Sequence, residues 1–196
     1  MASLLRKETD AILAANQIDI AAGREKNLSP ALLDRLLLNP KRIQEMAEGL
    51  ATLIKLPDPV GVITDSWKRP NGLKVKKVRI PLGVIGMIFE ARPNVIVDAA
   101  GLCIKSGNAV ILRGGSEAFH SCQILTQLWQ QVLKQRRLPL ALVQTIPTTK
   151  HKAVAELLQM DSYIDLIIPR GGASLMETVR QHSKIPVLRH DKGICH

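Results

Sequence analysis

The amino-acid sequence predicts an α/β protein in which a doubly wound, mostly parallel sheet follows an N-terminal helical layer and a β-hairpin. From residue 82 onward, short runs of branched apolar residues alternate with longer amphipathic stretches. That alternation is typical of strand–helix–strand units in a parallel sheet. The hydrophobic fraction is 46% of 196 residues, which is enough to bury one sizeable core.

Residues 1–58 are expected to form the helical layer. Apolar residues recur through residues 2–22, which predicts a first helix. Ser29-Pro30 and Asn39-Pro40 each combine an N-cap residue with a proline in the first helical position, so two more helices are expected to start there. The second of these carries an amphipathic stripe formed by Ile43, Met46, Ala47, Leu50 and Ile54.

Residues 59–80 are expected to form a β-hairpin. Two β-rich segments, 60–67 and 73–80, are joined by Arg69-Pro70-Asn71-Gly72, a strong turn signal. The second segment is rich in lysine and arginine, and the whole chain carries a net charge of +10, which raises nucleic acid as a partner. Aromatic residues total only 3%, too few for base stacking. A solvated strand face, or an enzyme with an anionic substrate, therefore accounts better for the charge.

Residues 81–196 are expected to form the α/β domain. The run from residue 82 to 89 suits a strand buried on both faces, and Asn94 and Gly107 suit the two ends of the helix that follows. The remaining predicted elements, in order, are strand 109–112, helix 118–136, strand 142–146, helix 150–160, strand 164–168, a helix ending near 181 and strand 185–188.

The sequence favours a cytoplasmic protein that binds no metal. No apolar run approaches the ~20 residues of a membrane span, and the N-terminus lacks a signal-peptide pattern. The cysteines, Cys103, Cys122 and Cys195, are odd in number and suit buried thiols in a reducing compartment. Cys195-His196 has no further ligands at a recognisable spacing, so no metal site is predicted.

Two similar loops follow predicted strands and precede predicted helices. They are Arg113-Gly114-Gly115-Ser116 and Arg170-Gly171-Gly172. Glycines let a phosphate approach the backbone, a helix start offers free N–H groups, and arginine offers a bidentate cation. The pair predicts a nucleotide crevice at the carboxyl edge of the sheet, with two tight turns bearing solvated arginines as the alternative. Neither GxGxxG after the first strand nor a Walker motif is present.

Several long motifs closely resemble the gamma-glutamyl phosphate reductase family of the aldehyde dehydrogenase superfamily. They are PLGVIGMIFEARPNVIVDAA, CIKSGNAVILRGGSEA, DSYIDLIIPRGGASL and IPVLRHDKGICH, with SPALLDRL and LPDPVG nearer the N-terminus. The resemblance implies an aldehyde-dehydrogenase-like cofactor domain. It also implies NADPH-dependent reduction of L-glutamate 5-phosphate to L-glutamate 5-semialdehyde in proline biosynthesis. In the family's chemistry a cysteine thiolate attacks the acyl phosphate, and the nicotinamide then reduces the thioester.

The resemblance also implies roles for particular residues. Asn94 matches the asparagine whose amide donates to the developing oxyanion, with simple helix capping as the alternative role. Arg113 matches the basic residue at the adenosine ribose or its 2′-phosphate, and Gly114, Gly115 and Ser116 begin the adjoining helix. Arg170, Gly171 and Gly172 match a second cofactor loop. The hairpin matches the bridging region through which the full-length family is expected to form homo-oligomers.

The family's nucleophilic cysteine belongs to a motif beyond His196, and Cys195 does not match it. We therefore expect an N-terminal part of such a reductase, with a truncated NADP-binding domain and no catalytic domain, that is inactive alone. The alternative is a non-catalytic nucleotide-binding or interaction fragment. His190 lies near the general-base position of hydrolytic aldehyde dehydrogenases but receives no role, because reduction of an acyl phosphate needs no such base.

Overall fold

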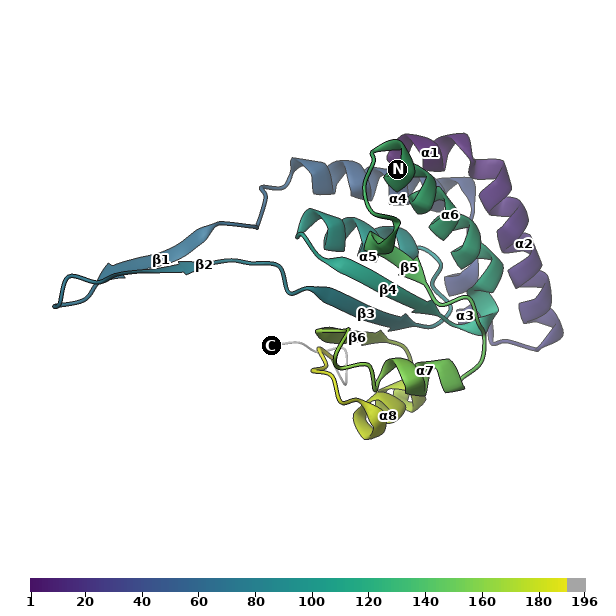
Figure 1. Ribbon diagram of the computed structural model, residues 1–196. Helices are drawn as coiled ribbons and strands as arrows, with labels where there is room; N and C mark the ends of the chain where they lie inside the picture. Colours follow the sequence, from purple (N-terminus) through teal and green to yellow (C-terminus); the bar gives the residue numbers. More distant parts are fainter. Residues whose placement is uncertain (190–196) are drawn as a thin grey trace.

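The computed structural model describes residues 1–189 and shows helices on both faces of a parallel sheet, with a hairpin projecting from one end (Figure 1). The order of strands is β5 (Val143–Thr145), β4 (Ala109–Gly114), β3 (Val84–Phe89) and β6 (Leu166–Arg170), and all neighbours in this sheet run parallel. This is the predicted doubly wound α/β class. Among the described residues, no helix is both long enough and apolar enough to cross a membrane.

Four helices form the N-terminal layer: α1 (Ala2–Lys7), α2 (Thr9–Glu25), α3 (Pro30–Leu36) and α4 (Pro40–Lys55). The predicted caps are confirmed, because the side chain of Ser29 accepts from Leu32 N and that of Asn39 accepts from Arg42 N. The single helix expected over residues 2–22 is wrong. It is interrupted at Glu8, where the Thr9 hydroxyl donates to backbone carbonyls of the preceding turn.

The expected stripe on α4 is confirmed except at its end. Ile43, Met46, Ala47 and Leu50 are buried, whereas Ile54 is 74% exposed. The stripe therefore runs out before the last turn, where α4 leads into the chain segment toward the hairpin.

The hairpin consists of β1 (Ile63–Lys68) and β2 (Lys74–Val78), paired antiparallel. Gly72 takes the left-handed conformation that the turn requires, with φ of 90°. The hairpin extends away from the rest of the molecule (Figure 1), and every residue of β1 is exposed. In the two strands Ile63, Trp67 and Val78 are exposed together with the lysines, and only Val75 is half-buried.

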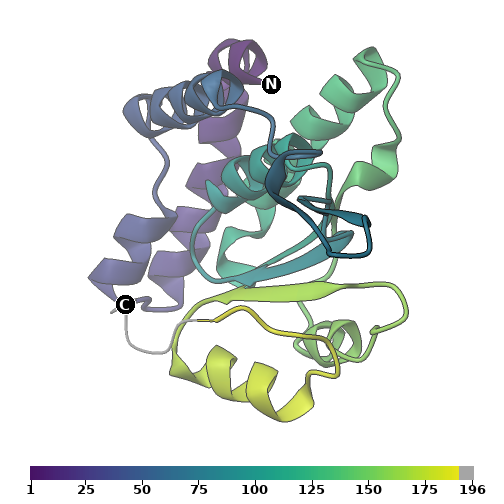
Figure 2. The ribbon, with the colours of Figure 1, turned by 90° about the vertical axis from the view of Figure 1, so that its left-hand side faces the viewer.

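The sheet is built from β3 (Val84–Phe89), β4 (Ala109–Gly114), β5 (Val143–Thr145) and β6 (Leu166–Arg170). Helices α5 (Val95–Lys105) and α6 (Phe119–Gln135) cover one face, and α7 (Lys152–Leu157) and α8 (Ala173–His182) cover the other (Figures 1 and 2). The expected strand at 185–188 is reduced to one bridge between Ile167 and Val187. Pro186 has no N–H, so it cannot extend the ladder.

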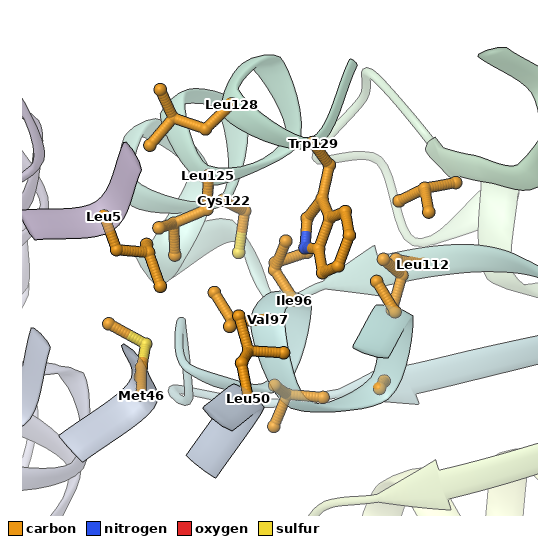
Figure 3. Close-up of a cluster of buried hydrophobic side chains, with 14 of the residues drawn as sticks. Leu5, Met46, Leu50, Ile96, Val97, Leu112, Cys122, Leu125, Leu128 and Trp129 are labelled. Carbon is orange, nitrogen blue, oxygen red and sulfur yellow. The ribbon is translucent and has the colours of Figure 1, made fainter. Parts of the chain in front are cut away.

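The main core joins the helical layer to α5, α6 and the sheet. Helix α5 lies in the middle of it, and Ile96, Val97 and Ala100 are completely buried. Figure 3 shows the side chains that meet around it: Leu5, Met46, Leu50, Ile96, Val97, Leu112, Cys122, Leu125, Leu128 and Trp129. A smaller cluster lies beneath α7 and α8.

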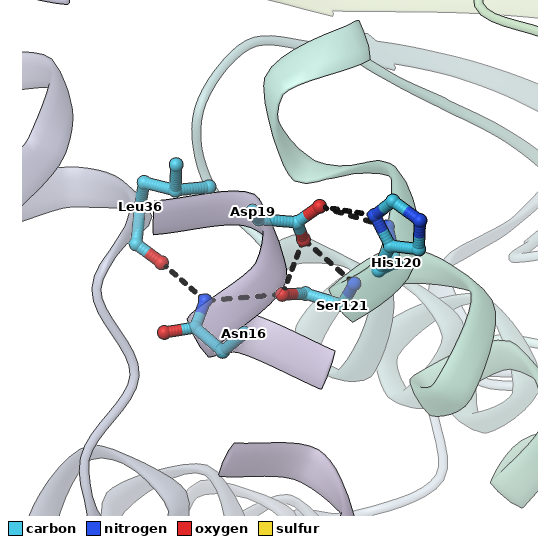
Figure 4. Close-up of polar contacts among 5 residues, drawn as sticks. All are labelled: Asn16, Asp19, Leu36, His120 and Ser121. Carbon is cyan, nitrogen blue, oxygen red and sulfur yellow. Dashed lines mark hydrogen bonds and ion pairs between the residues drawn. The ribbon is translucent and has the colours of Figure 1, made fainter. Parts of the chain in front are cut away.

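One buried carboxylate joins the helical layer to the start of α6 (Figure 4). Asp19 of α2 is only 2% exposed. It accepts from the backbone N–H groups of His120 at 3.0 Å and Ser121 at 2.8 Å, and from the Ser121 hydroxyl at 2.6 Å. The His120 ring nitrogen Nδ1 lies 2.9 Å from the same carboxylate. Asp19 therefore acts as the N-cap of a helix about a hundred residues later in the chain, which no local sequence pattern reveals.

Asn16 completes this network one turn earlier on α2. Its amide donates to Leu36 O at 2.8 Å and to the Ser121 hydroxyl at 3.0 Å, and its oxygen accepts from Leu38 N at 2.8 Å. The end of α3 is thus fixed against both α2 and α6.

Replacing Asp19 with alanine is expected to lower the free energy of unfolding by about 2–4 kcal/mol, because buried N–H groups lose their acceptor. Urea denaturation followed by Trp129 fluorescence measures this. Asp10→Ala, at an exposed position of the same helix, is the matched control and should change the value by less than about 0.5 kcal/mol. Equal losses in the two variants would contradict the capping role.

Candidate site at the carboxyl edge of the sheet

The turn from Glu90 to Asn94 lies at the point where the chain changes its direction of travel across the sheet. β3 has β4 on one side and β6 on the other, and the chain visits β4 and β5 before it crosses to β6. In open α/β sheets, ligands bind outside the carboxyl ends of the strands at such a point. The turn is therefore the natural centre of a binding site.

Two carboxylates hold this turn in place. Ala91 has a positive φ of 44°, unusual for a residue other than glycine, and it is buried. Its N–H donates to the Glu117 carboxylate. Glu90 N donates to Arg170 O at 3.1 Å, and the Glu90 carboxylate accepts from Gly172 N at 2.7 Å. The turn is thereby tied to the ends of both neighbouring strands.

Some backbone N–H groups at the helix starts near the two loops already donate to carboxylates of the chain itself. At the start of α6, the N–H groups of His120 and Ser121 are bonded to Asp19. At the start of α8, the N–H of Gly172 is bonded to Glu90. Of the predicted loop residues, Gly172 therefore does not offer a free N–H group, because the Glu90 carboxylate accepts from it.

Arg113 is not a solvated arginine. It is 5% exposed, and its guanidinium donates to the carbonyls of Gly114 at 2.6 Å and Thr149 at 3.1 Å. Burial lowers the pKa of this guanidinium, while the nearby Glu117, Cys122 and Glu90 oppose that shift. Its Nε is buried and has no hydrogen-bond partner among the described residues.

Gly114 serves packing. A Cβ at this position would lie 2.8 Å from Cys122 Sγ and 3.2 Å from the Phe89 ring, so a side chain does not fit. The close approach at Gly114 is therefore to the protein's own core.

Asn94 occupies the N-cap position of α5, but its side chain makes no capping bond. The predicted capping role is wrong, because Asn94 has helical φ and ψ and its amide turns along the helix instead. The Nδ2 group donates to Asp98 Oδ2 at 2.9 Å. Burial raises the pKa of Asp98, and the bond from Asn94 opposes that shift. The amide nitrogen carries a second hydrogen that this bond does not use.

Three cavities surround the turn. The first, of about 410 Å³, lies over the ends of β3 and β4 and is lined by Arg113, Gly115, Ser116, Glu117 and His151, with Ser174 and Thr178 of α8 opposite. A second, of about 360 Å³, contains Arg35, Arg92, Arg170, Gly171 and Gly172. A third, of about 380 Å³, contains Asn94 and Asp98.

The three cavities adjoin one another through shared residues. Glu90 lines the first and the second, whereas Arg35 and Arg92 line the second and the third. The predicted loop residues are therefore divided. Arg113, Gly115 and Ser116 face one cavity, and Arg170, Gly171 and Gly172 face the next.

The described thiols belong to the core, as expected. Cys103 is 6% and Cys122 is 3% exposed. Burial raises the pKa of Cys103 to about 11 and that of Cys122 further, so neither forms a thiolate readily near neutral pH. Residues 1–189 contain no group of three or more side chains arranged to hold a metal ion. Cys195, His196 and His190 lie outside the described residues.

The comparisons with known proteins identify the relatives of this chain. No family model matches it. Gamma-glutamyl phosphate reductase from Moorella thermoacetica is 57% identical over 196 residues, which is all of this chain and 47% of the relative. The enzyme of the same name from Shewanella denitrificans is 55% identical over the same share. The chain is a homologue of the gamma-glutamyl phosphate reductases. It spans about half the length of the curated relatives that it matches.

The solved structures agree with this relationship. A crystal structure of gamma-glutamyl phosphate reductase from Thermotoga maritima has a TM-score of 0.92 and 42% identity, covering 96% of this chain and 45% of that chain. The corresponding structure from Saccharomyces cerevisiae has a TM-score of 0.89 and 37% identity, covering 99% and 49%. An acetylating aldehyde dehydrogenase from Geobacillus thermoglucosidasius, at 18% identity and a TM-score of 0.69 over 95% and 38%, shares the fold. The fold is thus common to the gamma-glutamyl phosphate reductases and to aldehyde dehydrogenases.

Glu117→Ala is expected to free the N–H of Ala91 and to speed its hydrogen exchange at least about fivefold, because a lost hydrogen bond of this kind is worth ~1 kcal/mol or more. Amide exchange followed by NMR measures this. Glu48→Ala, an exposed glutamate of α4, is the control and should leave the exchange of Ala91 unchanged. Unaltered exchange in Glu117→Ala would show that the turn is held by other contacts.

Proposed function

We propose that this chain forms the cofactor-binding part of a reductase that converts L-glutamate 5-phosphate to L-glutamate 5-semialdehyde in proline biosynthesis. The observation that carries the proposal is the similarity to gamma-glutamyl phosphate reductases over the whole chain, at 50–57% identity. The oxidoreductase chemistry on an aldehyde follows from that relationship and agrees with the shared aldehyde dehydrogenase fold. A cytoplasmic location is part of the same proposal.

The domain organisation proposed here has three parts. Residues 1–58 form the helical layer, residues 59–80 the bridging hairpin, and residues 81–196 the part that binds the cofactor. The exposed apolar side chains of the hairpin, which include Ile63, Trp67, Leu73 and Val78, support a further proposal that the hairpin contacts another copy when the enzyme assembles as a homo-oligomer.

The 410 Å³ cavity is the proposed place of a nicotinamide cofactor, and NADPH is proposed over NADH. The fit is supported by Arg113, which lines the cavity and whose guanidinium is held by the carbonyls of Gly114 and Thr149. Gly115 and Ser116 line the same space, and Glu117 offers carboxylate oxygens to hydroxyl donors of a ribose. Gly114 shapes the loop beneath them. The resemblance assigns Arg170, Gly171 and Gly172 to a second cofactor loop, but they line the adjoining 360 Å³ cavity, so the proposed cofactor place does not depend on them. When bound, the cofactor supplies the hydride for the reduction.

Asn94 is the proposed oxyanion donor. Its bond to Asp98 fixes the orientation of the amide plane and therefore the direction of the second Nδ2 hydrogen. A preoriented donor of this kind stabilises the charge that develops on a carbonyl oxygen under attack. The described thiols are core residues and are not proposed as the nucleophile.

NADPH is expected to bind to the purified 196-residue chain with a change in nicotinamide fluorescence. Ser174→Trp should weaken that binding at least about tenfold, because the indole fills part of the 410 Å³ cavity. Gln181→Trp places the same ring two turns along α8, outside the cavity lining, and should change the affinity less than about twofold.

Parallel titrations with NADH test the choice of cofactor, and tighter binding of NADPH is expected. Absence of NADPH binding, or equal binding by the two tryptophan variants, would contradict the assignment of this cavity. Binding of NADPH that is unaffected by Ser174→Trp would favour a nucleotide-binding fragment whose site lies elsewhere.

A further inference from the structure

Three arginines from separate parts of the chain line one cavity beside the turn. Arg35 comes from α3, Arg92 from the turn after β3, and Arg170 from the end of β6. None of the three side chains has a hydrogen bond or an ion pair with another described residue. The cavity they share measures about 360 Å³.

The three guanidinium groups are close enough to repel one another. The pKa of Arg92 is lowered first by burial and then by the charges of Arg35 and Arg170. Like charges gathered without counter-charges destabilise the folded protein, and such arrangements are typical of sites that bind an anion. The cavity lining contains one carboxylate, that of Glu90, whose oxygen is already bonded to Gly172 N. An excess of two positive charges therefore remains.

A neighbouring arginine, Arg42, differs from these three because its charge is balanced by groups of the protein itself. Arg42 lines the adjoining cavity of about 380 Å³, and its guanidinium donates to Asp34 Oδ1 at 2.8 Å and to Leu37 O at 2.7 Å. Arg42 thus serves the structure of the α3–α4 connection. Arg35, only one residue from Asp34, is not engaged in this way.

The position of the arginines relates them to the proposed chemistry. Arg35 and Arg92 line both the arginine cavity and the cavity that contains Asn94. In an acyl phosphate, the phosphoryl group is separated from the carbonyl carbon by a single oxygen. A carbonyl oxygen near the Asn94 amide therefore places the phosphoryl group near Arg92.

We propose that Arg35, Arg92 and Arg170 form the site that binds the phosphoryl group of the acyl phosphate substrate and the inorganic phosphate released from it. This inference rests on the proposed function for the identity of the substrate, and on the geometry alone for the anion. Guanidinium groups bind phosphate oxygens through charge-assisted, bidentate hydrogen bonds. A cavity with three guanidinium groups and two excess positive charges is better matched to a phosphate dianion than to one carboxylate, which carries a single negative charge.

The test uses inorganic phosphate as the probe and isothermal titration of the purified 196-residue chain. One phosphate is expected to bind per chain, and Arg92→Gln, Arg35→Gln and Arg170→Gln should each weaken binding at least about tenfold. Arg69→Gln, at the exposed turn of the hairpin, removes the same charge far from the cavity and should leave the affinity within about twofold. Arg35 and Arg170 are exposed, so their variants keep the test valid if Arg92→Gln unfolds.

Two further ligands distinguish the source of the anion. L-glutamate carries the carboxylates of the substrate without its phosphate, and 2′-AMP carries the ribose phosphate of NADPH. We expect the three arginine variants to lose more affinity for phosphate than for L-glutamate or 2′-AMP. It is overturned if phosphate does not bind, if the three variants match Arg69→Gln, or if only glutamate or 2′-AMP depends on them.

The outcomes are separable from those of the proposed function. Phosphate binding that requires the arginines, in a chain that does not bind NADPH, would preserve this anion site while removing the cofactor assignment. NADPH binding that responds to Ser174→Trp, with phosphate binding indifferent to the arginines, would remove this inference while leaving the cofactor assignment intact.

Discussion

The strained turn after β3 is the constraint on which the proposed site depends. Ala91 keeps a left-handed backbone because Glu117 accepts its N–H, while Glu90 ties the preceding residue to the start of α8. These bonds connect the ends of β3, β4 and β6 at one place. Glu90 of the turn lines both the cavity proposed for the cofactor and the arginine cavity, and Arg92 lines the arginine cavity and the Asn94 cavity. We therefore attribute the two proposed binding compartments, one for the cofactor and one for the phosphoryl group, to the turn at Ala91 that Glu90 and Glu117 hold.

The helical layer contributes to the site through buried polar bonds as well as through apolar packing. Asp19 caps α6, and Asn16 bonds to the carbonyl of Leu36, the residue after Arg35. The same network therefore fixes the end of α3 and so the place from which Arg35 reaches the turn. In this way residues of the N-terminal layer, which the sequence suggested only as a cover for the sheet, help to determine the electrostatics of its carboxyl edge.

The sequence predicted those features that local patterns encode. The alternation of apolar runs gave the order of strands and helices, and Ser29-Pro30 and Asn39-Pro40 gave two helix starts that the structure confirms. Features that depend on contacts between distant residues were missed or wrong. Asp19 occupies N–H groups of α6, Asn94 bonds to Asp98 in place of capping α5, and Thr9 interrupts the first helix. The arginine cluster joins residues 35, 92 and 170, whose proximity exists only in the fold.

The central claim is that the turn separates two binding compartments, and one titration tests it most directly. Inorganic phosphate is titrated into the purified chain with and without saturating NADPH, and the two affinities for phosphate are compared. Separate compartments predict that phosphate still binds to the NADPH complex, with an affinity within about threefold of that of the free protein. Loss of phosphate binding in proportion to NADPH occupancy would show that both ligands use one site, and would contradict the account.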